Sequence, residues 1–232
     1  MSSLADQNRP LRVFEKILGG GLGNGNIGVV MSRHGTGKVA LLTSIALDHA
    51  MDGKPALHVA LGKSVSSVRA FDDEVLDEIL NSLNVQDRAE ILTVVERNKQ
   101  IYTYPAGEFG PKRLRSTLTF LRDHAEFVPQ LIELQGWPNF EGVTIEEVND
   151  LRGVAKEFDC EIWCTAHTHL VEDTDDRGVP SWLTRFDAEL SAIIELQPES
   201  DHLRLKFIKT PGDHPEGVHL EFDPRSMLVR WR

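Results

Sequence analysis

Apolar residues follow two different periods along this chain. Short apolar runs rich in β-branched residues alternate with longer segments in which apolar residues recur every three or four positions. The first pattern is typical of buried strands and the second of amphipathic helices. The runs that predict strands are 27–31, 56–61, 101–104, 130–134 and 161–165. Helical spacing predicts a short helix over 11–18 and longer helices over 37–51, over 64–95 in two pieces, from Pro111, and after a capping box of Thr144 and Glu147.

The order of these elements predicts an α/β fold. Strands and helices alternate for roughly the first 165 residues, which implies right-handed crossovers and a mainly parallel sheet flanked by helices. The four later strand-like runs, 190–196, 203–208, 218–222 and 227–231, follow one another through turns. We expect them to extend the sheet with antiparallel strands. A single domain over 1–232, with a polar tail at 1–10, is the simplest interpretation.

Composition and charge narrow the classes of function. The chain has 232 residues, of which 41% are hydrophobic and 26% charged, as in ordinary globular proteins. Its net charge of −11 argues against binding to nucleic acid backbones, which requires a basic face. The sequence has no apolar stretch of about 20 residues that could cross a bilayer and no apolar signal core near Met1, so we expect no membrane partner and a cytoplasmic location. Cys160 and Cys164 are expected to be buried thiols.

The segment from Val29 to Val39 has the order of a phosphate-binding loop. An apolar strand leads into a glycine-containing turn, which is followed by a lysine and a helical pattern. In the full motif a first glycine is followed after four residues by Gly-Lys and then Ser or Thr. The candidate nucleotide-binding residues are Ser32, Arg33, His34, Gly35, Thr36, Gly37, Lys38 and Val39. An ordinary glycine-rich turn between a strand and a helix is the alternative interpretation.

Two positions of this loop depart from the motif. Ser32 replaces the first glycine, and we expect it to adjust the entry of the chain into the loop. Val39 replaces the residue whose hydroxyl ligates Mg²⁺, so a bound metal ion loses a protein ligand there. Binding of a nucleotide by Lys38 and the backbone amides is compatible with both changes.

The order of motifs resembles the RecA-like ATPases, most closely the clock protein KaiC and its relatives. Four stretches carry this resemblance: 19–22 (Gly-Gly-Gly-Leu), 35–38 (Gly-Thr-Gly-Lys), 131–133 (Leu-Ile-Glu) and 207–212 (Phe-Ile-Lys-Thr-Pro-Gly). The resemblance implies a RecA-like P-loop NTPase core, ATP or ADP as ligand, and a homo-oligomeric ring or filament with nucleotide at the subunit interfaces.

The positions that the resemblance assigns to catalysis are altered here. Gly62 and Lys63 stand where the family has its catalytic glutamate pair. Glu133 stands at the Walker B aspartate and is the one candidate catalytic residue. Pro211 replaces the arginine that would reach a neighbour's nucleotide, while Lys209 remains as a candidate trans-interface residue. We therefore expect a nucleotide-binding, scaffold or regulatory domain with impaired ATP hydrolysis, a pseudoenzyme whose protein partner the sequence does not identify.

Other interpretations stay open at this stage. An active Mg²⁺-dependent ATPase would use Glu133 or the acidic residues of 171–176 to hold the metal ion and activate water. A metal site at His167 and His169 with Glu172 and Asp173 competes with an ordinary polar loop. A nucleic-acid motor is disfavoured by the acidity of the chain. The four tryptophans (137, 163, 182 and 231) are scattered, as is typical of core or interface residues.

Overall fold

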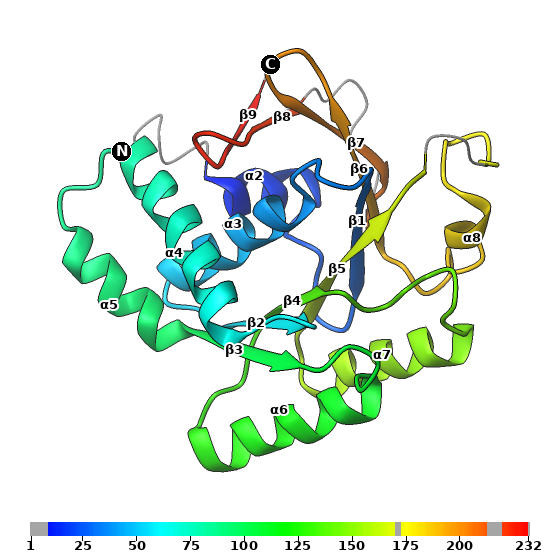
Figure 1. Ribbon diagram of the computed structural model, residues 1–232, viewed down its shortest axis with the longest axis horizontal. Helices are drawn as coiled ribbons and strands as arrows, with labels where there is room; N and C mark the ends of the chain where they lie inside the picture. The colour runs from blue at the N-terminus through cyan, green and yellow to red at the C-terminus, as the bar shows by residue number, and fades with distance from the viewer. Residues whose placement is uncertain (1–8, 170–172, 213–219, 232) are drawn as a thin grey trace.

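A single mixed sheet organises the fold. The computed structural model describes residues 9–169, 173–212 and 220–231, and within these residues nine strands form one sheet in the order β3-β2-β4-β5-β1-β6-β7-β8-β9. The strands from β1 to β6 run parallel, whereas β7, β8 and β9 pair antiparallel. Both parts of the sheet confirm the α/β fold expected from the pattern (Figure 1).

The strands lie close to the predicted runs. The parallel strands are β1 (Ile27–Ser32), β2 (Ala56–Leu61), β3 (Lys99–Tyr104), β4 (Leu131–Gln135), β5 (Glu161–His167) and β6 (Ala192–Pro198). The antiparallel strands are β7 (Leu203–Lys209), β8 (Leu220–Asp223) and β9 (Leu228–Trp231). The predicted strand at 218–222 begins outside the described residues.

Helices cover both faces of the sheet. One face carries α2 (Pro10–Ile17), α3 (Lys38–Met51), α4 (Val65–Ser82) and α5 (Arg88–Asn98), and the other carries α6 (Pro111–Ala125), α7 (Ile145–Glu157) and the short α8 (Ser181–Thr184) (Figure 1). The short α8 was not predicted from the sequence, because its four residues are too few to show a helical period. The capping box of Thr144 and Glu147 is confirmed at the start of α7.

The direction of the connections changes beside β1. The helices that link β1 to β2 and β2 to β3 lie on one face, and those that link β3 to β4 and β4 to β5 lie on the other. The loops that leave the carboxyl ends of neighbouring β1 and β5 therefore diverge, and so do those of β2 and β4. In open α/β sheets such a switch point opens a crevice in which ligands bind.

Two buried contacts hold the centre of the fold. Gly28 of β1 lies opposite Trp163 of β5, and a Cβ atom on Gly28 would come within 2.5 Å of the indole ring, so this position has room for glycine alone. Arg9, which the sequence analysis places in the polar tail, is buried and pairs with Asp48 and Asp52 of the α3 region. The start of α2 is thereby fixed to the central helix.

The cysteines and tryptophans agree with the simpler interpretations. Cys160 and Cys164 are free and buried, although Cys160 precedes β5 rather than lying in it. Trp163 is buried, and Trp137 and Trp182 pack against the core.

Candidate functional site

The loop between β1 and α3 occupies the carboxyl edge of the sheet. Gly35 and Gly37 have φ angles of 76° and 94°, a region that residues with a side chain rarely adopt. Ser32 is instead the last residue of β1, where it pairs with His167 of β5. Because Ser32 keeps a strand backbone, this position does not require the glycine of the motif.

Lys38 folds back over the loop. Its side chain is buried, and Nζ donates hydrogen bonds to the Ser32 carbonyl (2.8 Å), the Ser32 hydroxyl (3.0 Å) and the Arg33 carbonyl (2.8 Å). These bonds use all three donors of the ammonium group. No salt bridge to Lys38 is found among the described residues, and burial lowers its pKa to about 8. Ser32 stands at the position of the motif's first glycine, and its hydroxyl oxygen thus accepts a hydrogen bond from Lys38.

Other basic side chains gather around Lys38. The imidazole rings of His34 and His167 stack with centroids 5.4 Å apart. Burial lowers the pKa of His167, as do the charges of Lys38, His34 and His169. Arg33 is exposed at the start of the loop. The edge of the sheet at β1 and β5 therefore favours an anionic ligand.

Two cavities flank the loop. The first, of about 480 Å³, adjoins Arg33 and is lined by residues that follow β5 and by the end of β6, among them Thr168, Glu195 and Gln197. The second, of about 230 Å³, adjoins the start of α3. It is lined by Val39, His58, Lys63, Ser67, Val68, Phe71 and Gln135.

Glu133 lies in the interior of the sheet rather than at its edge. Its carboxylate accepts a hydrogen bond from the Thr43 hydroxyl (2.8 Å), and its Oε2 lies 3.5 Å from Nδ1 of His58. The residue is 1% exposed, and burial raises its pKa. Glu133 lines neither of the two cavities beside the loop. The structure therefore gives the candidate catalytic carboxylate structural partners on α3 and β2.

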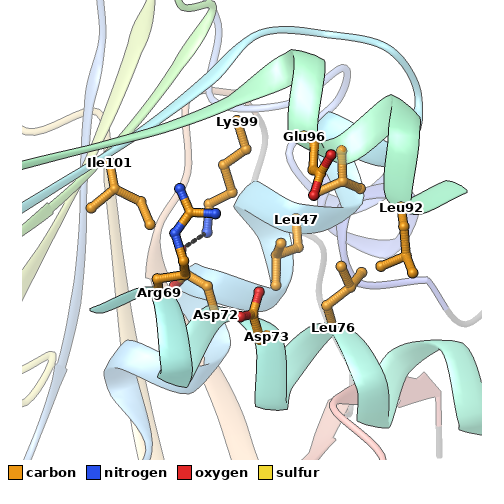
Figure 2. A pocket seen from close by; sticks show the side chains of 10 residues that line it. Leu47, Arg69, Asp72, Asp73, Leu76, Leu92, Glu96, Lys99 and Ile101 are labelled. Atoms are coloured by element: carbon orange, nitrogen blue, oxygen red, sulfur yellow. Dashed lines mark hydrogen bonds and ion pairs between the residues drawn. The ribbon is translucent and has the colours of Figure 1, made fainter. Parts of the chain in front are cut away.

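A buried ion network continues from Glu133 to the next cavity. Nδ1 of His58 lies 3.0 Å from Asp72, which also accepts a hydrogen bond from Lys99. Although burial alone would lower it, the carboxylates of Glu133 and Asp72 hold the pKa of His58 above its ordinary value. Lys99, Asp72 and Arg69 line a small cavity of about 90 Å³ between α4, α5 and β3. Figure 2 shows these side chains.

Gln135 is the residue that the sequence analysis missed. Strand β4 continues to Gln135, one residue past the predicted end, and the side chain of Gln135 lines the same cavity as Val39. In a parallel sheet the last strand residue, rather than one in the middle, lies beside a loop at the carboxyl edge. The alternation of Leu131, Glu133 and Gln135 on one face was the signal that could have identified it.

The other candidate residues form hydrogen bonds or ion pairs with side chains or carbonyls other than those of the loop. Lys209 donates hydrogen bonds to the carbonyl and the carboxylate of Asp187 in its own chain. His169 pairs with Glu141 at 2.9 Å, and Asp173 accepts a hydrogen bond from Ser181.

The described residues at this edge do not form a metal site. Among the described residues, no three His, Cys, Asp or Glu side chains gather to hold a metal ion. Glu172, like Val171 of the acidic loop, lies outside the described residues.

In the described part of the chain, no helix combines the length and apolar character needed to cross a membrane. A scan against protein-family models finds no match to this chain, and a search of curated proteins also finds none.

Proposed function

We propose that this chain is a RecA- or KaiC-like P-loop domain that binds the phosphate groups of ATP or ADP at residues 32–39 and hydrolyses ATP poorly. The observation that carries this proposal is Lys38. Its ammonium group is buried at the start of α3, at the switch point of the sheet, and is held by oxygen atoms of the loop. A lysine and backbone N–H groups at a helix start are a common phosphate-binding arrangement.

The arrangement of the sheet supports the same proposal. The loop strand β1 lies between β5 and β6, and β5 separates it from β4, the strand that carries Glu133 and Gln135. Arg33 adds to the positive potential beside the loop, and the stacked rings of His34 and His167 offer further N–H donors to an anion. A polyphosphate on the loop would lie between the two flanking cavities, of about 480 Å³ and about 230 Å³.

The same geometry supports poor hydrolysis. Phosphoryl transfer depends on positioning, charge neutralisation and a group that orients water. The second cavity is lined by Val39, Gln135 and Lys63, and none of these is a general base at neutral pH. Its histidine, His58, faces the carboxylates of Asp72 and Glu133, which favour the protonated imidazole over the free base. A trans arginine is worth about 10³–10⁵ in rate where it has been measured, and Pro211 stands at that position.

One observation favours a second candidate, a scaffold that binds no nucleotide. All three donors of Lys38 are already satisfied by the loop, so a phosphate must replace at least one of these bonds. If Lys38 keeps these three hydrogen bonds permanently, the loop has no lysine donor for a phosphate. The fold would then serve for assembly with a second copy or another protein.

Thermal unfolding in the presence of ATP or ADP separates these two candidates. A ligand at 100 times its Kd adds about 2.7 kcal/mol to stability, which is readily measured. We expect both nucleotides to raise the melting temperature of the natural chain and not that of Lys38→Ala. The matched control is Lys112→Ala, an exposed lysine on α6. An equal shift in Lys38→Ala would exclude the loop as the site, and no shift in any variant would favour the scaffold.

A turnover assay tests the chemistry. We expect phosphate release from Mg²⁺-ATP near the uncatalysed background, unchanged by Glu133→Gln, because Glu133 lines neither cavity. Robust release that Glu133→Gln abolishes would support an active ATPase instead. Sizing of the same samples with and without nucleotide tests the proposed homo-oligomeric ring or filament.

A further inference from the structure

The second cavity has an unusual set of groups for a nucleotide site. Mg²⁺ beside a P-loop is held by the hydroxyl after the lysine and by a carboxylate at a strand end. Here those places are taken by Val39 and Gln135, and both side chains line the cavity of about 230 Å³. Among the described residues, no carboxylate lines this cavity. Mg²⁺ prefers oxygen ligands, carboxylates above all, so the residues present do not fit the metal ion.

Glu133 does not replace the missing carboxylate. It accepts a hydrogen bond from Thr43, lies close to His58, and is fully enclosed between β4 and α3. The polar groups that a metal ion would meet in this cavity are the amide of Gln135, the hydroxyl of Ser67, the ammonium group of Lys63 and the imidazole ring of His58.

The cavity is suited instead to an anion. The Lys63 side chain lies at its rim, and no ion pair of Lys63 is found in the part of the chain that the structure describes. His58 is 1% exposed, and its Nε2 has no hydrogen-bond partner in the described structure, while its Nδ1 is engaged by Asp72. Ser67 of the first turn of α4 adds a hydroxyl and the positive end of an 18-residue helix.

We propose that the loop binds its polyphosphate without magnesium, and that the Lys63 ammonium and His58 Nε2 contact the terminal phosphate where a divalent cation would otherwise lie. This inference rests on the proposed function, because it concerns the ligand of the same loop. The ligand is metal-free ATP or another polyphosphate, with Lys38 on one side of the phosphate chain and Lys63 on the other.

The charges explain why the metal ion is not needed. Mg²⁺ neutralises phosphate oxygens in P-loop sites, and here Lys38 at the start of α3 and Lys63 in the second cavity take that role. A divalent cation in the same cavity would be repelled by Lys63, and Val39 and Gln135 would give little in return.

Titration of ATP and of inorganic tripolyphosphate, once in EDTA and once in excess Mg²⁺, tests the inference. We expect binding in EDTA at least as tight as in Mg²⁺. Lys63→Ala should weaken binding in EDTA about tenfold, the loss expected for one charge-assisted hydrogen bond at a partly exposed site, while Lys112→Ala should not. The double variant Val39→Thr with Gln135→Asp should restore a requirement for Mg²⁺.

The outcomes separate this inference from the proposed function. Binding seen only with Mg²⁺ and lost in Lys38→Ala would overturn the inference and leave the phosphate-binding loop standing. Unchanged affinity of Lys63→Ala in EDTA would also overturn it. Absence of binding in both buffers would instead remove the proposed function itself.

Discussion

The affinity of the loop for ADP should fall as the pH rises from 7 to 9. The rise in pH acts on the Lys38 ammonium group. This group donates hydrogen bonds to three oxygen atoms of the loop, and burial lowers its pKa to about 8. With that pKa, about nine-tenths of the free protein carries the charged lysine at pH 7 and about one-tenth at pH 9. An exposed lysine, with a pKa near 10.4, would remain charged over the whole range.

The expected change in affinity follows from these fractions. If the ammonium contacts phosphate, binding at pH 9 must first protonate Lys38, so the Kd should be about tenfold higher than at pH 7. The phosphates of ADP are ionised throughout this range, since the last pKa of a phosphate monoester is near 6. The neighbouring His167 has a lowered pKa and is neutral over the same range, so it adds no titration of its own.

Calorimetric titration at pH 7, 8 and 9, in EDTA and at constant ionic strength, measures this effect. The matched control is Lys38→Ala, whose residual affinity should change less with pH than that of the natural chain, because only the Lys38 contribution is removed and the proposed contact of His58, whose pKa Glu133 and Asp72 raise, is kept. A Kd that stays constant to pH 9 in the natural chain would refute the reasoning, because it would mean that Lys38 either remains charged or does not contact the ligand.

Stability measurements test the packing of the fold. Gly28→Ala should destabilise the protein by about 2–3 kcal/mol, because the added methyl group meets the Trp163 ring, whereas Gly153→Ala in α7, which meets no neighbour, should stabilise it by about 0.5–1 kcal/mol in urea denaturation. Asp48→Ala should cost about 3 kcal/mol, since it removes one of the carboxylates that pair with the buried Arg9 guanidinium; a loss below 1 kcal/mol would show that this ion pair does not anchor α2.

The fold could be predicted because it follows from local patterns. Most of the parallel strands are short apolar runs bounded by glycine, proline or polar residues, and most of the longer helices have an apolar stripe or an evident cap. The loop from Ser32 to Lys38 was visible for the same reason, since its strand, glycines, lysine and helix are contiguous. Right-handed crossovers then leave few ways to arrange the strands.

The groups around the loop were harder to predict because they meet only in the folded chain. Glu133 is the candidate catalytic residue from the sequence, whereas β4 continues two residues further to Gln135, and the amide of Gln135 lines the cavity beside Val39. Strand ends depend on pairing with neighbours and are uncertain by one or two residues from sequence. Likewise, Arg9 is polar in the sequence and buried in the structure because Asp48 pairs with it.

The backbone amide spectrum of the isotopically labelled chain, recorded with and without ATP in EDTA, tests the central claim most directly. The claim is that the loop amides and Lys38 hold phosphate. We expect the largest shifts at the amides of residues 33–39, smaller shifts near Lys63 and Gln135, and none of these in Lys38→Ala. Saturating ATP that leaves the loop amides unchanged, or shifts them equally in Lys38→Ala, would contradict the account.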